Sequence, residues 1–123
     1  METVLLIEDN EDIADLSKHA LQSQGYDAIV VRSRNAAVEF LRDDGIPAII
    51  ILDWHMPGMS IEKFILELTA MCKDHPLPRL ILSTAGPDAD KVAKSLSIPE
   101  VLRKPFDLTN PLKAVDGTAG VRG

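Results

Sequence analysis

The sequence is poor in the features that mark several protein classes. It has a single cysteine, Cys72, so no internal disulfide can form, which fits a reducing compartment. No apolar run approaches the roughly 18 residues needed to span a bilayer. The first residues also lack the basic start and small-residue cleavage site of a signal peptide. These absences predict a cytoplasmic protein.

Basic side chains are scarce relative to acidic ones. Thirteen Lys and Arg residues stand against nineteen Asp and Glu residues, which gives a formal net charge of -6. An acidic protein repels the phosphates of nucleic acids and the headgroups of anionic lipids. We therefore expect neither nucleic acid nor membrane among the direct partners.

The features that are present predict one α/β domain. A chain of 123 residues can be served by a single hydrophobic core, and 46% hydrophobic with 26% charged residues is ordinary globular composition. Short apolar runs alternate with amphipathic stretches along the chain. The runs occupy residues 4–7, 28–31, 48–52, 80–82 and 101–102. Five such runs separated by helical patterns indicate a parallel sheet built from βαβ units, with helices on both faces.

The connecting segments carry helix signals. Ile13, Leu16, Ala20 and Leu21 recur at helical spacing in the first connector, and Gly25 stands where a helix end needs positive φ. Ser33 and Ser60 are suitable N-caps for a second and a third helix, the second ending near Gly45. A fourth helix is expected over about 87–96, and a short last one from Asn110 to about Gly117.

Polar side chains gather where the predicted strands end. Crossover connections bring the carboxyl ends of all parallel strands to one edge of the sheet, where ligands bind in such folds. Three acids at one edge repel one another unless a cation or a proton intervenes. An all-oxygen cluster suits a hard ion, and Mg²⁺ is the first choice. The residues at the strand ends are Glu8, Asp9, Asp53, Ser83, Thr84 and Lys104.

Asp53 is the candidate nucleophile. It follows the most apolar run, so the surrounding core should fix its position. An aspartate that attacks phosphorus forms an acyl phosphate. Because phosphoryl transfer depends on neutralising charge on the equatorial oxygens, magnesium, the Thr84 hydroxyl and the Lys104 ammonium would each contribute to this pocket.

Four segments together resemble one known family. They are LLIEDNED, LDWHMPGM, LSTA and LRKPF, in this order along nearly the whole chain. The chain is similar to the CheY-like receiver domains of two-component response regulators. The resemblance implies a flavodoxin-like three-layer sandwich, with helices on both faces of a five-stranded parallel sheet. The strand order 2-1-3-4-5 is taken from this family, which is one of the known examples of that order.

The resemblance also implies roles for individual residues. Asp53 would be the phosphoacceptor, and Asp9 would bind Mg²⁺ directly while Glu8 binds it through water. The backbone carbonyl of His55 would be a further metal ligand. Thr84 and Lys104 would contact the phosphoryl group. The bond between Lys104 and Pro105 is expected to be cis.

The same resemblance implies signal relay rather than enzymatic turnover. A histidine kinase or phosphotransfer protein would donate the phosphoryl group to Asp53, and a downstream protein, not identifiable from the sequence, would respond to the altered surface. Residues 1–116 would form the receiver domain and residues 117–123 a flexible C-terminal tail. We therefore expect the 123 residues given to form a receiver domain alone, with no DNA-binding or catalytic effector among them.

Departures from the family pattern keep other hypotheses open. Val101 stands three residues before Lys104, where the family often has an aromatic residue that turns inward on activation. A pseudo-receiver that binds partners without phosphorylation is therefore one alternative. A phosphatase of the haloacid dehalogenase type is another, although His55 replaces the second acid of its Asp-x-Asp motif. In the plainest alternative, Asp9 and Asp53 are only acids favoured near helix N-termini.

Overall fold

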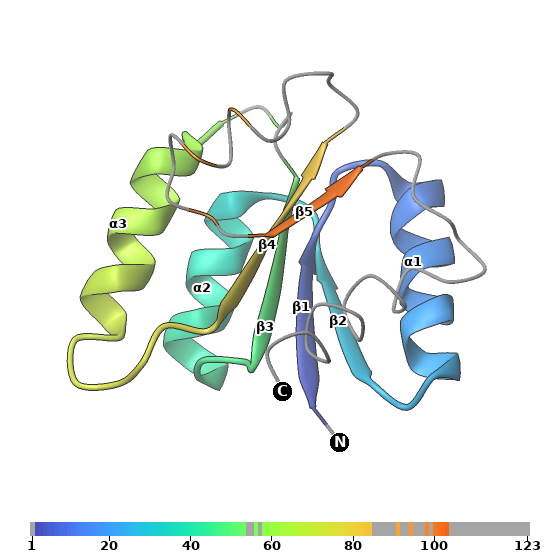
Figure 1. Cartoon of the computed structure of the whole chain (residues 1–123), viewed down its shortest axis with the longest axis horizontal. Helices are drawn as coiled ribbons and strands as arrows, with labels where there is room; N and C mark the ends of the chain where they lie inside the picture. Colours follow the sequence, from blue (N-terminus) through green and yellow to red (C-terminus); the bar gives the residue numbers. More distant parts are fainter. Residues whose placement is uncertain are drawn as a thin grey trace.

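The computed structural model describes residues 2–53, 56, 58–84, 91, 94, 98 and 100–103, with Thr84 and residues 100–103 described by their backbone alone (Figure 1). Strands and helices alternate along the chain as predicted through β4. The elements are β1 (Thr3–Ile7), α1 (Glu11–Ser23), β2 (Asp27–Val31), α2 (Arg34–Asp44), β3 (Ile49–Asp53), α3 (Ile61–Met71), β4 (Arg79–Thr84) and β5 (Glu100–Arg103).

The strands form one parallel sheet with the order β2-β1-β3-β4-β5. β1 lies between β2 and β3, with Leu5 opposite both Ile29 and Ile50. β3 in turn pairs with β4, which places Asp53 opposite Ser83. The predicted order 2-1-3-4 is therefore confirmed, and the backbone of β5 pairs with the outer side of β4.

The central strand β3 is buried along its whole length. Its side chains alternate between two hydrophobic clusters because successive residues of a strand point to opposite faces. Ile49 and Ile51 belong to the cluster that includes Leu21 of α1. Ile50 and Leu52 belong to the larger cluster, which includes residues of α2 and α3. Helices thus cover both faces of the described sheet, as Figure 1 shows.

Helix α1 begins at a side-chain cap and buries Ala20 and Leu21, as its predicted spacing indicated. Asn10 Oδ1 accepts a hydrogen bond from the Ile13 amide at 3.0 Å, which satisfies one of the free amides of the first turn. Leu16, which shares the predicted helical spacing with Ala20 and Leu21, differs from them because its side chain is 52% exposed. Small Ala14 and Ser17 face the sheet instead and allow the helix to approach it closely.

Serine caps begin α2 and α3, as predicted. Ser33 Oγ accepts from the Ala36 amide at 3.0 Å, and Ser60 Oγ accepts from the Lys63 amide at 3.1 Å. Gly25 and Gly45 follow α1 and α2 with φ of 94° and 93°, a region that favours glycine. Helices α2 and α3 lie side by side on the same face of the sheet (Figure 1).

Several predictions fall outside the described residues. They concern most of the fourth helix at 87–96, the last helix, the tail at 117–123 and the bond between Lys104 and Pro105. Within the part of the chain that is described, none of the helices is long and apolar enough to cross a membrane.

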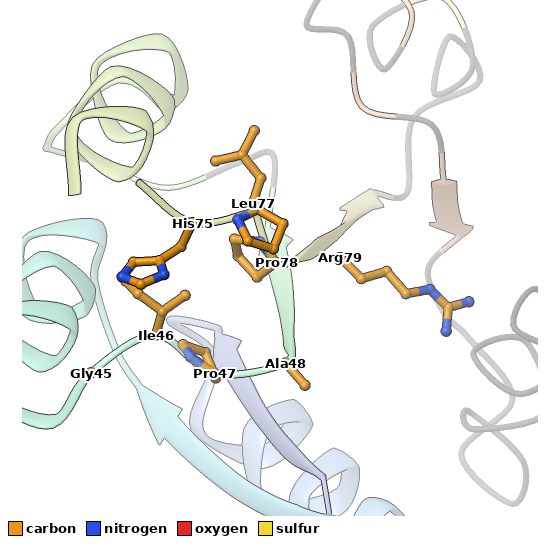
Figure 2. A pocket seen from close by; sticks show the side chains of 9 residues that line it. Gly45, Ile46, Pro47, Ala48, His75, Leu77, Pro78 and Arg79 are labelled. Carbon is orange, nitrogen blue, oxygen red and sulfur yellow. The ribbon is translucent and has the colours of Figure 1, made fainter. Parts of the chain in front are cut away.

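A hollow of about 590 Å³ opens where β3 and β4 begin, at the edge of the sheet away from the predicted site (Figure 2). It is formed by the α2–β3 and α3–β4 connections. Proline and aliphatic side chains dominate its lining, which consists of Gly45, Ile46, Pro47, Ala48, His75, Pro76, Leu77, Pro78 and Arg79.

Candidate functional site

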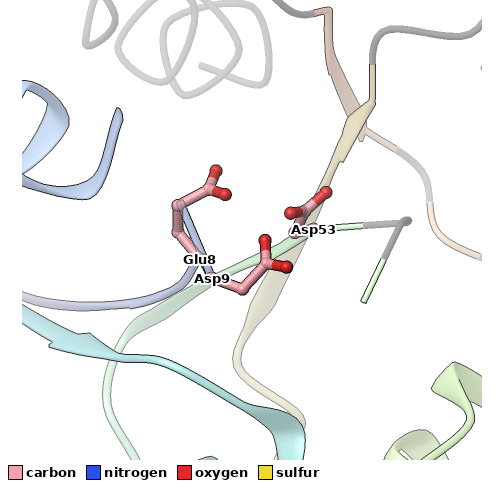
Figure 3. A group of neighbouring side chains, drawn as sticks. All are labelled: Glu8, Asp9 and Asp53. Carbon is pink, nitrogen blue, oxygen red and sulfur yellow. The ribbon is translucent and has the colours of Figure 1, made fainter. Parts of the chain in front are cut away.

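Three carboxylates meet at the carboxyl ends of β1 and β3 (Figure 3). Glu8 and Asp9 follow directly after β1, and Asp53 is the last residue of β3. The register that pairs Ile7 with Leu52 brings the ends of these neighbouring strands together. Each acid offers a carboxylate oxygen, and these oxygens all lie within 4.8 Å of one another. The sequence correctly predicted that these residues converge.

Burial distinguishes the three acids. Glu8 and Asp53 are 1% and 3% exposed, whereas Asp9 is exposed to solvent. Both the backbone and the side chain of Glu8 form hydrogen bonds. Its amide donates to the Val31 carbonyl at 3.1 Å, and its carboxylate accepts from the Asn10 amide at 3.2 Å. Two carboxylates are therefore fixed by the fold, and the third lies at the open side of the group.

The strands extend slightly further than predicted. Asp53 belongs to β3 itself, and Ser83 and Thr84 belong to β4 rather than following it. Asp53 therefore takes part in the ladder with β4, and its position is fixed by pairing as well as by the hydrophobic core. Ser83 lies next to it and is buried, and none of the described groups forms a hydrogen bond with its hydroxyl.

Other predicted site residues are only partly described. Thr84 is at the end of β4, as expected, but only its backbone is described. His55 and Lys104 lie outside the described residues, as does Trp54. Their roles remain predictions.

Arg34 is a site residue that sequence reasoning missed. It is the first residue of α2 and is only 3% exposed. Its Nη2 donates to the backbone carbonyl of Asp53 at 2.7 Å, and its Nη1 donates to the carbonyl of Met59 at 2.8 Å. A signal was present in the sequence, since Arg34 shares the i, i+3, i+4, i+7 face with buried Ala37, Val38 and Leu41.

The electrostatics of Arg34 link it to the acids. Burial lowers the pKa of its guanidinium from the ordinary value, while nearby carboxylates oppose that shift. In decreasing order of effect, these carboxylates belong to Asp53, Glu62 and Asp9. Arginine stays charged in proteins, so a permanent positive charge lies behind the acidic group.

Arg32 makes a similar contact on the neighbouring strand end. Its Nη2 donates to the backbone carbonyl of Asp9 at 3.0 Å, in an exposed position. The connection after β2 therefore supplies one guanidinium to the backbone of Asp9, and the first residue of α2 supplies another to that of Asp53. The sequence offered no signal for Arg32, because a solvent-facing arginine is ordinary.

The donor set of the acidic group fits a hard divalent cation. All the available ligands are carboxylate oxygens, which Mg²⁺ and Mn²⁺ prefer over soft donors. Oxygens on opposite sides of Mg²⁺ are about 4.2 Å apart for a metal–oxygen distance of about 2.1 Å. The observed limit of 4.8 Å is near this span, and water can complete the coordination of an acid that stands further away.

A comparison with protein families decides the family of the chain. Residues 4–116 match the model of the response regulator receiver domain. The chain belongs to the response regulator receiver domain family. Receiver domains are signalling modules of two-component systems rather than enzymes of the usual kind, and the acidic group Glu8, Asp9 and Asp53 is consistent with their active site.

Known relatives agree with this assignment. The receiver domain is 28% identical over 116 residues to the phosphate regulon transcriptional regulatory protein PhoB of Escherichia coli, covering 91% of this chain and 50% of PhoB. The chain thus spans about half the length of the curated relatives it matches.

Solved structures share the fold. The chemotaxis response regulator CheY4 of Vibrio cholerae superposes with a TM-score of 0.79 at 24% identity, over 95% of this chain and 98% of that one. The Mn²⁺-bound form of response regulator Rcp1 superposes with a TM-score of 0.71 at 23% identity, over 98% and 93% of the two chains.

Proposed function

We propose that this receiver domain accepts a phosphoryl group on Asp53 in a Mg²⁺-dependent reaction and relays the signal by changing conformation. The observation that carries the proposal is the buried Asp53 carboxylate, grouped with Glu8 and Asp9 at the strand ends of a chain of this family. Burial and strand pairing hold the nucleophile in place, and solvent-exposed Asp9 leaves an open side for ions and phosphate.

The transfer itself is a simple substitution at phosphorus. A carboxylate oxygen of Asp53 forms a bond to phosphorus as the bond to a nitrogen of the donor phosphohistidine breaks, and the imidazole keeps that electron pair. A bound Mg²⁺ would neutralise charge shared by the carboxylates and the phosphoryl oxygens. Asp9 would bind the ion directly, Glu8 through water, and His55 through its backbone carbonyl.

Two further residues complete the proposed pocket. Thr84 ends β4, next to the strand that carries Asp53, and would donate its hydroxyl to a phosphoryl oxygen. Lys104 follows directly after Arg103, the last residue of β5, and its ammonium would meet another oxygen. With Mg²⁺, these groups would balance the charge that builds up during transfer.

The wider proposal follows from the family. The donor would be a histidine kinase or a phosphotransfer protein, and an unidentified downstream protein would bind the phosphorylated form. We also propose that residues 1–116 form the receiver domain and residues 117–123 a tail, and the family match over residues 4–116 supports the domain part of this proposal. We also propose a complete three-layer sandwich and a cytoplasmic location.

The test uses Trp54, the only tryptophan, which is the neighbour of Asp53 in the sequence. Mg²⁺ followed by acetyl phosphate or beryllofluoride should change its fluorescence, and intact-protein mass spectrometry should show one added phosphoryl group. Asp53→Asn should abolish the phosphodonor response. Asp12→Asn is the matched control, because Asp12 is an exposed acid in the first turn of α1, outside the acidic group.

The wild-type result separates the alternatives. A folded wild-type protein that shows neither added mass nor a fluorescence change would contradict the proposal and favour the pseudo-receiver. Added mass that persists in Asp53→Asn would place the phosphoryl group on another residue. Continuous release of phosphate far beyond one equivalent would favour the phosphatase alternative.

A further inference from the structure

A buried arginine joins the two ends of the segment that follows the proposed phosphoacceptor. Arg34 donates from one terminal nitrogen to the carbonyl of Asp53, where β3 ends, and from the other to the carbonyl of Met59. Met59 directly precedes Ser60, the N-cap of α3. One guanidinium thus fixes both the end of β3 and the approach to α3.

Burial of the charged Arg34 side chain would destabilise the fold if these contacts did not compensate for it. A charged side chain that is 3% exposed loses most of its hydration, and this loss must be offset by hydrogen bonds and opposite charge. A cation in the first turn of a helix also opposes the helix dipole. The contacts of 2.7 and 2.8 Å are short, as expected for hydrogen bonds from a charged donor.

The geometry requires a guanidinium rather than any cation. Its planar fork sends separate N–H groups to two acceptors that lie in different directions, whereas the ammonium of lysine is a single point of charge. Asp53 and Met59 are six positions apart in the sequence. Loss of either contact would release one end of the segment between them.

We propose that Arg34 is a positioning residue that holds the backbone of Asp53 and the end of the β3–α3 connection at Met59, so that the Asp53 carboxylate is aligned for metal binding and phosphoryl transfer. This inference rests on the proposed function of Asp53. It assigns Arg34 no contact with substrate, because its described hydrogen bonds go to backbone carbonyls.

Positioning and charge predict opposite results for Mg²⁺ affinity. If Arg34 acted only through its charge, then Arg34→Met would remove a cation near three acids and strengthen Mg²⁺ binding, while Arg34→Lys would behave as wild type. If Arg34 positions the backbone, both variants should weaken Mg²⁺ binding and slow phosphorylation. Misplacement of a reacting group by about 1 Å can cost about 100-fold in rate.

The experiment measures three quantities for each variant. They are the Mg²⁺ dissociation constant from Trp54 fluorescence, the rate constant for phosphorylation by acetyl phosphate, and the free energy of unfolding in urea. Arg42→Met is the matched control, since Arg42 lies on the same helix with a 61% exposed side chain and contacts only Glu67 at 3.5 Å among its described partners. Hydrogen–deuterium exchange of the peptide from Asp53 to Met59 reports the backbone directly.

We expect Arg34→Lys and Arg34→Met to weaken Mg²⁺ binding and to lower the phosphorylation rate constant by about ten- to 100-fold. Exchange in the Asp53 to Met59 peptide should rise while exchange in β1 stays low. Arg42→Met should match wild type in all of these measurements.

Three results would overturn the inference. Arg34→Lys could match wild type in every measurement. Arg34→Met could bind Mg²⁺ more tightly. Both variants could lose stability while Mg²⁺ affinity, the phosphorylation rate constant and exchange in the Asp53 to Met59 peptide remain unchanged, which would make Arg34 merely structural. A wild-type protein that takes no phosphoryl group would instead contradict the proposed function, and exchange in the Arg34 variants would still decide whether the residue holds this backbone.

Discussion

At the scale of single residues, the buried polar groups fall into two kinds. Glu8, Asp53 and Arg34 are buried with partners supplied by the fold, and they surround one site. Ser17 is buried in α1 with no described hydrogen-bond partner for its hydroxyl. Replacing a residue of the first kind should destabilise the fold, whereas replacing Ser17 by an apolar residue should stabilise it.

Ser17→Ala should therefore stabilise the protein. The change removes a buried hydroxyl without a described partner and replaces it with the best helix former. We expect the free energy of unfolding to rise by about 0.5–1 kcal/mol. Urea denaturation followed by circular dichroism measures this change, and a decrease would show that the hydroxyl has a partner in solution.

Cys72 should be unreactive in the folded state. It is 5% exposed at the end of α3, and burial raises the pKa of its thiol. Since the thiolate is the nucleophile, alkylation by iodoacetamide at neutral pH should be slow until the protein is unfolded in urea. Equal alkylation rates with and without urea would contradict the burial.

The raised pKa also predicts how stability depends on pH. The folded state retains the thiol proton at pH values where the unfolded chain has lost it, so stability falls as pH rises above the unfolded value of about 8.5. Urea unfolding from about pH 8 to about pH 10 should therefore show a steeper decline in wild type than in Cys72→Ala. Parallel declines would indicate that other groups account for the whole effect.

At the scale of elements, the helix starts illustrate how local chemistry positions the site. Asn10 caps α1 directly after Glu8 and Asp9, which follow β1, and Ser60 caps α3 directly after Met59. Each cap satisfies an amide that would otherwise lack a partner in the first turn. The caps therefore limit where the connections around the acidic group can run.

Ser60→Ala should destabilise α3. The hydroxyl accepts from the Lys63 amide at 3.1 Å, and loss of an N-cap costs about 1 kcal/mol. Because the Met59 carbonyl is an acceptor for Arg34, the Mg²⁺ dissociation constant should also rise in this variant. Ser60→Asp is the control, since aspartate is an equally good cap and should restore stability.

The sequence predicted the elements well where a single periodicity dominated. The apolar runs predicted β1 and β3, and Ser33 and Ser60 predicted where α2 and α3 begin. It failed where size mattered more than hydrophobicity, because Ala14 and Ser17 pack against the sheet while the larger Leu16 is exposed. Close approach of a helix to a sheet selects small residues, and hydrophobic periodicity alone does not show this.

The site was predicted in part for a related reason. Strand ends in a parallel sheet meet at one edge, so the convergence of Glu8, Asp9 and Asp53 follows from topology. Arg34 was missed because charged residues are almost never fully buried, and that expectation outweighed its position on the inward face of α2. Its role depends on the distance from α2 to two backbone carbonyls, which only the folded structure gives.

At the scale of the whole molecule, metal binding should be linked to stability. Three carboxylates in one small space repel one another, and an ion bound between them relieves this repulsion only in the folded state. At a Mg²⁺ concentration of about 100 times the dissociation constant, the free energy of unfolding should increase by about 2.7 kcal/mol.

Thermal or urea unfolding with and without Mg²⁺ measures this linkage. Asp9→Asn should lose most of the Mg²⁺ effect and should itself be more stable than wild type without metal, because one repelling charge is gone. Asp12→Asn should retain the full effect. Stabilisation by Mg²⁺ that is the same in all three proteins would indicate general screening rather than a specific site.

The position of β3 in the sheet has a further consequence. Its neighbours on both sides and the helices on both faces shield its amides from water, so exchange there requires the entire domain to open. Asp53 ends this strand and shares its protection. The Asp53 carboxylate is thus anchored to a strand that is buried along its whole length, and thermal fluctuations of the surface can rearrange its surroundings without displacing it.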